Sequence, residues 1–335
     1  MIDDKFVTLA YGNGGLFMRA LIEKIFARHL ANPQLDVTAD AVYVPLQPGE
    51  VMLTTDGFTV HPLEFPGGDI GSLAVHGTVN DLAVAGATPV YLTLNAFIEE
   101  GMEFSQLDRL IESTARAAKT CGVRVAAGDT KVLRRGEGGG LYLATTGLGI
   151  RHPGLRLGLD HIRPGDVVLV SGPVGDHGTA VLLAREDFGL KGDLTSDAAS
   201  VLPLAQALWD LPGLRFMRDP TRGGLVTVMH DIAHATGLTV YLEERVIPIH
   251  PPVRGVCAML GYDPLYLACE GRVVAVLSAE TAPTALGRWR ALPGGEDAAI
   301  IGGLSGSTSQ VVLKTEIGGE RLLEELEDDP LPRIC

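Results

Sequence analysis

The sequence has 335 residues, of which 46% are hydrophobic and 20% charged, and its formal net charge is −14. This length favours two domains, each large enough to bury a hydrophobic core. The acidic balance, without any lysine- or arginine-rich run, excludes nucleic acid and anionic membranes as expected partners.

The four cysteines, Cys121, Cys257, Cys269 and Cys335, include no C-x-x-C pair and no histidine at zinc-ligand spacing. The first residues lack the basic and apolar regions of a secretory signal, and no uncharged apolar stretch reaches about 18 residues. We therefore expect free thiols in a reducing compartment, the cytoplasm.

Residues 1–36 are expected to form a glycine-rich loop followed by a helix. The loop reads Tyr11-Gly-Asn-Gly-Gly15. A glycine-rich turn that opens a helix can hold phosphate with its free N–H groups, and a flexible lead-in is the alternative. The apolar face of the predicted helix consists of Leu16, Met18, Leu21, Ile22, Ile25 and Phe26.

Residues 37–155 form the first predicted α/β domain, because strand and helix patterns alternate along this stretch. Asp69 is expected to cap the start of one helix, and Gly122 the end of another. Cys121, in the last turn of that helix, is then a core residue. The predicted strands are 51–55, 90–97, 123–127 and 141–150, and the predicted helices are 70–85 and 104–121.

Residues 156–318 form the second predicted α/β domain, in which strands and helices again alternate. The two halves share aspartates at glycine-containing turns, although no exact repeat aligns. The predicted strands are 167–170, 238–242, 272–277 and 298–301, and the predicted helices are 179–185, 197–211 and 222–236.

Residues 319–335 are expected to form a short acidic helix and a mobile tail. The run from Glu320 to Asp329 predicts a helix that ends near Pro330. Pro330 and Pro332 then stiffen an extended arm that carries Cys335, the last residue. A frayed terminus whose cysteine has no task is the alternative.

Four aspartates carry the main chemical signal: Asp56, Asp81, Asp129 and Asp219. Magnesium takes oxygen ligands and bridges carboxylates to substrate phosphates, so aspartates at adjacent strand ends predict a metal–nucleotide site. Each aspartate alone also fits a cap or a turn. An acidic chain needs such a metal if it is to bind a nucleotide.

Two further residues are candidates for proton transfer or phosphate contact. Lys131 follows Asp129 by two residues, where its ammonium group could meet a phosphate, and a surface lysine is the alternative. Glu270 lies between apolar stretches, where a carboxylate needs a partner or a task. His76 and His177 lie beside glycines and fit structural hydrogen bonding as well as catalysis. The sequence contains neither a Walker A pattern nor a G-x-S-x-G elbow.

Seven blocks together resemble the HypE family of hydrogenase maturation factors. They run in order along nearly the whole chain, and the final P-R-I-C is typical of the HypE family itself. The other blocks are shared more loosely with aminoimidazole ribonucleotide synthetase and selenophosphate synthetase. The blocks are Thr55-Asp-Gly57, Pro66-Gly-Gly-Asp-Ile-Gly71, His76-Gly-Thr-Val-Asn-Asp81, Gly128-Asp-Thr-Lys131, Gly175-Asp-His-Gly178, Arg218-Asp-Pro-Thr-Arg-Gly-Gly224 and Pro332-Arg-Ile-Cys335.

The resemblance implies two α/β domains of the aminoimidazole ribonucleotide synthetase type. In this fold an N-terminal mixed sheet binds ATP and forms a homodimer, and a larger C-terminal α/β domain precedes the mobile tail. The resemblance also implies ATP and Mg²⁺ as cofactors, with Asp56, Asp81, Asp129 and Asp219 as metal ligands. The implied nucleotide-binding residues are Asp56, Asp81, Asp129, Thr130, Asp219, Thr221, Gly67, Gly68 and Asp69.

The resemblance further implies a reaction on Cys335. In the family, HypF places a carbamoyl group on the C-terminal cysteine, and HypE uses ATP to dehydrate this thiocarboxamide to a thiocyanate. The cyano group then passes to iron on a HypC–HypD complex for a [NiFe] hydrogenase. Carried over by position, Lys131 and Glu270 are the candidates that deprotonate the carbamoyl nitrogen.

Two residues depart from the family pattern. The family commonly has a histidine and a small residue before the paired glycines, where this chain has Tyr11-Gly-Asn. Asparagine is frequent before the glutamate, where this chain has Cys269. Two alternatives stay open: a synthetase of the same superfamily that acts on a free small molecule, and a non-catalytic carrier of the group on Cys335.

Overall fold

The computed structural model describes residues 4–185, 193–327, 331 and 334–335. These residues divide into two compact units. The first unit comprises the chain up to Leu82, Ala87–Arg151 and Cys335, and the second comprises Ala83–Gly86 and His152–Ile334. Within the described ranges, no helix is both long and apolar enough to cross a membrane.

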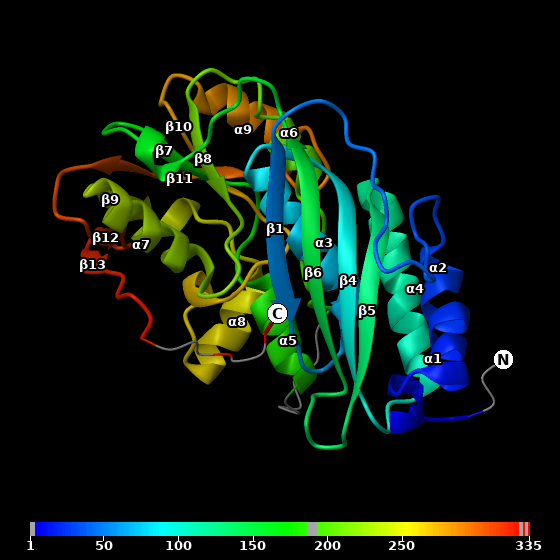
Figure 1. Cartoon of the computed structure of the whole chain (residues 1–335). Coiled ribbons are helices and arrows are strands. Elements are labelled where there is room, and N and C mark those ends of the chain that lie inside the picture. The colour runs from blue at the N-terminus through cyan, green and yellow to red at the C-terminus, as the bar shows by residue number, and fades with distance from the viewer. Residues whose placement is uncertain (1–3, 186–192, 328–330, 332–333) are drawn as a thin grey trace. The chain divides into compact units, whose positions relative to one another are not determined.

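The first unit is built on a four-stranded mixed sheet, as expected. Its strand order is β1-β6-β4-β5, in which β5 runs parallel to β4 and the other neighbours are antiparallel. Figure 1 shows α3 and α4 behind this sheet, while no helix of the described residues covers its front face. The elements are η1 (Leu9–Gly12), α1 (Gly15–Leu21), η2 (Ile22–Ala27), α2 (Arg28–Leu30), β1 (Val51–Phe58), β2 (Glu64–Phe65), β3 (Gly68–Asp69), α3 (Ile70–Val84), β4 (Ala87–Glu99), α4 (Phe104–Cys121), β5 (Arg124–Leu133) and β6 (Leu141–Arg151).

Helix α4 follows directly from its sequence. Phe104, Leu107 and Ile111 recur at helical spacing and are buried against the sheet. Gly122 ends the helix with a φ of 71°, in the left-handed region that favours glycine. The prediction of a helix over 104–121 is therefore confirmed, and Cys121 is buried as expected.

The N-terminal helix buries only the later part of its predicted apolar face. Leu21, Ile25 and Phe26 are buried, whereas Leu16 is 76% exposed, so its placement on the buried face was wrong. Tyr11 is buried, and its hydroxyl donates a 2.6 Å hydrogen bond to Asp4 Oδ2. These contacts give Tyr11 a place in the core.

Two strands of the first unit extend further than predicted. The turn residues expected after 51–55 belong to β1, where Asp56 pairs with Thr145 of β6. The segment Gly128–Lys131 likewise lies inside β5 and pairs with β4. Glycine and aspartate usually weaken strands, but here neighbouring strands supply the backbone hydrogen bonds. The expected strand ends at Asp56 and Asp129 are therefore wrong.

The second unit is built on a seven-stranded sheet whose central strands β7 and β10 are buried on both faces. The strand order is β13-β12-β9-β11-β7-β10-β8. Along β7, Val168 packs with Met229 of α7, whereas Leu169 packs on the other face with Trp289 of α9. The elements are η3 (Leu159–His161), β7 (Val167–Val170), α5 (Asp176–Arg185), α6 (Leu202–Gln206), β8 (Leu214–Arg218), α7 (Gly224–Thr236), β9 (Thr239–Glu243), η4 (Glu244–Val246), α8 (Pro251–Leu260), η5 (Pro264–Tyr266), β10 (Val274–Leu277), α9 (Ala282–Arg290), β11 (Ala299–Ser305), β12 (Val311–Lys314) and β13 (Glu320–Leu322).

The predicted helix over 197–211 is much shorter in the structure, where α6 spans only Leu202–Gln206. Ser196 Oγ accepts the N–H of Ala198, and Ser200 Oγ accepts the N–H of Leu202. Such local side-chain hydrogen bonds compete with the helical pattern.

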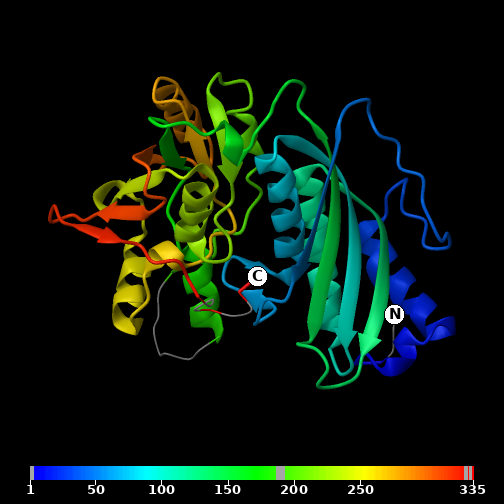
Figure 2. The same cartoon turned by 60° about the vertical axis from the view of Figure 1, so that its left-hand side comes forward.

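The predicted acidic helix after Gly319 is wrong, because its first residues form β13. The Thr315 N–H donates to the Gly319 carbonyl and Gly318 has a φ of 87°, so the chain reverses there. Glu320–Leu322 then pairs with the edge of β12, and Figure 2 shows the two strands side by side. Pro330 and Pro332, which define the predicted arm, lie outside the described residues.

Candidate functional site

Asp56 and Asp81 lie on the helix-covered side of the first sheet. Thr54 Oγ1 of β1 donates a 2.7 Å hydrogen bond to Asp81 Oδ2 of α3, and Asp56 follows on the same side of β1. Gly77 lies one turn before Asp81, and a Cβ there would lie 3.9 Å from Asp56 Oδ2. The two carboxylates therefore face the same region, an arrangement that suits a divalent cation.

Asp129 lies on the opposite face of the same sheet. Asp56, Thr145, Leu94 and Gly128 are paired across the four strands, so they share the face that carries α3. Asp129 is the next residue of β5 and points to the open face. Because β1 and β5 are the two edge strands, about 14 Å separates them. The prediction that adjacent strand ends bring Asp56 and Asp129 together is wrong.

Asp129 and Lys131 form an ion pair on this open face. Lys131 Nζ lies 2.8 Å from Asp129 Oδ2, and both side chains are more than half exposed. The Lys131 hydrogen bond holds the pKa of Asp129 below its usual value, with help from the Thr130 N–H. A solvent-exposed ion pair contributes little to the stability of the fold. The pair can therefore open at little cost, and both side chains are accessible to a ligand.

The loop at Gly67–Asp69 positions helix α3. Asp69 Oδ1 accepts the N–H of Ser72 at 2.9 Å, which confirms the predicted N-cap, and Oδ2 accepts the Ser113 hydroxyl at 2.6 Å. Gly67 has a φ of 94°, and a Cβ on Gly68 would lie 2.9 Å from Phe65. These contacts account for all three residues by the local fold alone.

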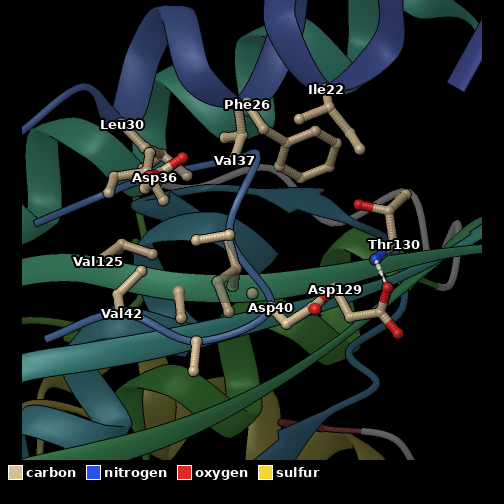
Figure 3. Close-up of a pocket in the computed structure, with 16 residues that line it drawn as sticks. Ile22, Phe26, Leu30, Asp36, Val37, Asp40, Val42, Val125, Asp129 and Thr130 are labelled. Carbon is tan, nitrogen blue, oxygen red and sulfur yellow. Dashed lines mark hydrogen bonds between the residues drawn. The ribbon is translucent and has the colours of Figure 1, made fainter. Parts of the chain in front are cut away.

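A small cavity lies against β5 in the first unit (Figure 3). Its volume is about 160 Å³, below the few hundred Å³ typical of pockets that enclose a whole ligand. Phe26 and Thr130 point toward it from the N-terminal helix and from β5, and Asp36 and Asp40 line it from the connecting segment. The last two were not predicted, because no sequence pattern distinguishes them from ordinary loop aspartates.

In the second unit, Asp219 and Thr221 form a tight turn between β8 and α7. Asp219 is 8% exposed, and its carbonyl accepts the N–H of Thr221. Gly224 has a φ of 61°, and a Cβ there would lie 2.6 Å from the Leu267 carbonyl oxygen. Glycine is required at this position because two backbone segments meet, and this packing holds Asp219 and Thr221 in place.

Glu270 is buried within the second unit, at 2% exposure. Its own N–H and that of Gly271 donate to the two carboxylate oxygens of Asp197, at 3.1 and 3.2 Å. Arg272 Nε lies 3.4 Å from Asp197 Oδ2. Sequence reasoning missed Asp197, because it fell inside the wrongly predicted helix, yet this carboxylate fixes the backbone that carries Glu270.

Asp176 and His177 begin α5 and are both buried. Burial raises the pKa of Asp176, while its hydrogen bond to His250 opposes this shift, and Arg272 lies 3.5 Å away. Burial lowers the pKa of His177, because in both residues it disfavours the charged form. The glycine-flanked sequence pointed to His177, whereas His250 had no sequence signal.

The described residues at the end of the chain are held by specific hydrogen bonds. In the second unit, His177 Nε2 donates to the Ile334 carbonyl at 2.8 Å, and Ile334 and Leu331 are buried. In the first unit, the Thr59 N–H donates to the carbonyl oxygen of Cys335 at 3.0 Å. Cys335 is partly exposed, whereas the other three cysteines of the described residues are buried. Its surroundings differ from those of a frayed terminus.

Cys269 differs from Cys335 in its burial. It is completely buried, and its sulfur accepts a hydrogen bond from the Gly175 N–H at 3.2 Å. Burial raises its pKa well above the usual thiol value. Since the thiolate is the nucleophile, Cys269 is a packing residue.

Comparison with known proteins covers both units. Residues 38–151 match the family model of the AIR synthase related protein N-terminal domain, and residues 163–314 match that of its C-terminal domain. The chain is 46% identical over 331 residues to carbamoyl dehydratase HypE of Azotobacter vinelandii, covering 98% of this chain and 97% of that protein. The chain belongs to the HypE family. Carbamoyl dehydratase HypE of Escherichia coli K12 is 40% identical and covers 98% of this chain and 99% of its own length.

Solved HypE structures share the fold. A crystal structure of a HypE protein in complex with ATP superposes with a TM-score of 0.93 at 41% identity, covering 98% of this chain and 99% of that chain. The HypE chain of a HypE–HypF complex gives a TM-score of 0.81 at 40% identity, with 92% and 100% coverage. The expected fold of two α/β domains of this type is therefore confirmed.

Proposed function

We propose that this HypE-family chain is an ATP-dependent carbamoyl dehydratase that acts on its own Cys335. It converts a carbamoyl group on the thiol into a cyano group, which becomes a ligand of the iron in a [NiFe] hydrogenase. Full-length relatives named carbamoyl dehydratase and a relative solved with ATP support the proposal.

The observation that carries the choice of Cys335 is the hydrogen bonding of the last two residues. His177 is fully buried, yet its Nε2 is used to hold the Ile334 carbonyl, and Thr59 holds the Cys335 carbonyl. Burying the imidazole of His177 costs desolvation free energy, and its hydrogen bond to the Ile334 carbonyl offsets this cost. The position of the last residues is therefore fixed by a buried polar contact. The partly exposed thiol then has a defined place.

The proposed chemistry balances as a dehydration coupled to ATP hydrolysis. The carbamoyl group on sulfur has one oxygen and two N–H protons, and the amide oxygen is a poor leaving group. ATP supplies the phosphoryl group that lets this oxygen leave as phosphate. Both N–H protons depart and the nitrogen closes to a nitrile, so the adduct loses the elements of one water.

Glu270 is the proposed group that takes a nitrogen proton, and Lys131 can take the second one only as a neutral amine, after its ammonium group has lost a proton to solvent. Glu270 is buried on a backbone fixed by Asp197, so its carboxylate has a defined position. Lys131 lies exposed beside Asp129, where it is also suited to contact phosphate. Asp56 and Asp81, whose carboxylates face the same region, are the proposed Mg²⁺ ligands. Asp129 with Thr130, Asp219 with Thr221, and the Gly67–Asp69 loop are proposed as separate contacts to the nucleotide.

Several partners follow from the same proposal. HypF supplies the carbamoyl group, as the solved HypE–HypF complex suggests for this chain, and a HypC–HypD complex accepts the cyano group. A homodimer forms through the first sheet. Val51 and Leu53 of β1 are 50% and 67% exposed on its open side, and β1 and β5 are edge strands that a second copy could cover.

Intact mass spectrometry of two variants tests the proposal. The protein is incubated with HypF, carbamoyl phosphate, ATP and magnesium. We expect Cys335→Ala to acquire no adduct while its ATP binding and oligomeric state stay unchanged. We expect Glu270→Gln to accumulate the carbamoyl form, because the nitrogen loses a base.

The same incubations separate the alternatives when ATP hydrolysis is measured beside the protein mass. A non-catalytic carrier would acquire the carbamoyl group on Cys335 and would never lose water with ATP. A synthetase acting on a free small molecule would hydrolyse ATP equally well in the Cys335→Ala variant. If the Cys335→Ala protein acquires the dehydrated adduct at another thiol, the proposed substrate is wrong.

A further inference from the structure

A second group of potential ligands lies in the second unit, on helix α7 and the segment after β13. His230 and His234 are four residues apart and share one face of α7, and Glu325 approaches this face. One ligand atom of each of the three residues lies within 4.8 Å of the others. His234 Nε2 is 3.7 Å from Glu325 Oε2, and the two imidazole rings are 5.7 Å apart.

His230 is held in the tautomer that a metal ligand requires. Its Nε2 lies 2.9 Å from the Leu323 carbonyl oxygen, and because a carbonyl only accepts, Nε2 carries the hydrogen. The lone pair of the neutral ring is then on Nδ1. His230 is only 8% exposed, and its buried Nδ1 has no hydrogen-bond partner among the described residues.

This arrangement is the usual one for a metal-bound histidine. Such a histidine donates its second ring N–H to a carbonyl or carboxylate, which fixes the ring and leaves the other nitrogen for the ion. A buried acceptor without a partner is rare in proteins and calls for an explanation. An ion pair between His234 and Glu325 does not provide one, because it leaves His230 Nδ1 unsatisfied.

The segment that carries Glu325 is fixed against the unit. Leu323 is 2% exposed, and its N–H donates to the Val311 carbonyl at 2.9 Å. The Tyr266 hydroxyl donates to the Glu324 carbonyl at 2.8 Å. The contacts of Leu323 and Glu324 therefore fix the backbone next to Glu325. The side chains of Glu325 and His234 are 58% and 53% exposed. An ion can therefore enter from solvent.

We propose that His230 Nδ1, His234 and Glu325 bind a first-row divalent transition-metal ion, zinc or nickel, with water in the remaining position. Two imidazoles and one carboxylate suit these ions, whereas magnesium and calcium prefer sites made of oxygen alone. Glu325 precedes Cys335 by ten residues. The ion would fasten the root of the segment that leads to Cys335 onto α7, separately from the aspartates proposed for ATP.

Equilibrium dialysis of tag-free, chelator-treated protein against zinc chloride or nickel chloride tests this site, with magnesium present to occupy oxygen-only sites. We expect His234→Ala and Glu325→Gln each to weaken binding at least tenfold. His230→Gln can still place an amide donor near the Leu323 carbonyl but lacks Nδ1, and we expect the same loss. His161→Ala removes an exposed histidine that is not among the proposed ligands, and this variant should bind as the unmodified chain does.

The Cys335→Ala protein controls for binding at the thiol and should retain the site. The proposal is overturned if the unmodified protein binds neither ion, or if His234→Ala and Glu325→Gln bind as tightly as it does. Equal loss in His161→Ala would also overturn it, since binding would then be non-specific. Circular dichroism of each variant must match that of the unmodified chain, and a folded His230→Gln protein that binds normally would contradict the role of Nδ1.

Discussion

The two units use their charged side chains in opposite ways. In the first unit, Asp129 and Lys131 pair in solvent on an uncovered sheet face. In the second, Asp197 and Arg272 pair in the interior, and Asp197 also holds two backbone N–H groups. Residues of the same type therefore have different tasks. The first pair is accessible to a ligand, whereas the second holds the backbone at Glu270 and Gly271 in place.

The largest effect is expected from Asp197→Ala. Removing this carboxylate takes the acceptor from the N–H groups of Glu270 and Gly271, and it removes one of the two buried carboxylates beside Arg272, the other being Asp176. Breaking a buried pair in this way costs about 3 to 5 kcal/mol of unfolding free energy. Urea unfolding measures the loss, and Asp193→Ala, an exposed aspartate nearby, should change stability by less than about 0.5 kcal/mol. A small effect of Asp197→Ala would remove the contrast between the units.

A somewhat smaller effect is expected on nucleotide binding at the half-buried carboxylates of Asp56 and Asp81. We expect a chelator to weaken ATP binding about a hundredfold, which corresponds to about 2.7 kcal/mol, because convergent carboxylates on an acidic chain repel a bare triphosphate. Isothermal titration measures the change. Asp81→Asn should reduce the metal dependence while leaving the unfolding free energy within about 1 kcal/mol. Equal ATP affinity with and without metal would return Asp56 and Asp81 to a purely structural role.

A pH effect of about 2 kcal/mol is expected from His76 in the first unit. Burial lowers the pKa of His76 from 6.5 to about 4, and its Nδ1 has no hydrogen-bond partner among the described residues. The unfolded chain therefore takes up the proton first as the pH falls below 6.5, and stability drops until the pH approaches 4. Between pH 7 and pH 5 the loss is about 2 kcal/mol.

The His76→Gln variant isolates this contribution, because glutamine cannot take up the proton. Its unfolding free energy should fall by about 2 kcal/mol less than that of the unmodified chain between the same two pH values. Parallel pH profiles for the two proteins would show that His76 is solvated and not desolvated by the fold.

The smallest effect on stability is expected from Lys131→Ala. An exposed ion pair is worth about 0 to 1 kcal/mol, so thermal unfolding should hardly change. Loss of the dehydrated adduct in the same variant would sharpen the contrast, because function would be lost without structure. A stability loss above about 2 kcal/mol would mean that the pair belongs with the buried ones.

Sequence patterns correctly predicted the elements that are determined by neighbouring residues in the chain. Helix α4 and its cap at Gly122 follow from apolar spacing and one glycine, and the Asp69 cap follows from its position before α3. The signals failed where distant partners decide. Glu320–Leu322 forms a strand because β12 offers an edge, and Asp129 lies inside β5 because β4 supplies its hydrogen bonds.

The residues of the candidate site show the same difference between local and long-range determinants. Each proposed residue could be named from its place in a short block of sequence, yet the faces on which Asp56 and Asp129 lie depend on strand register. Asp197 and His250 could not be found, because their partners Glu270 and Asp176 are distant in sequence and the contacts exist only after folding.

The most direct test of the central claim is peptide-level mass spectrometry of the C-terminal fragment after reaction with HypF and carbamoyl phosphate, with and without magnesium and ATP. We expect a carbamoyl group on Cys335 without ATP, and the same fragment lighter by one water when ATP and magnesium are present. A carbamoyl group on Cys121, Cys257 or Cys269, or an adduct on Cys335 that never loses water with ATP, would contradict it.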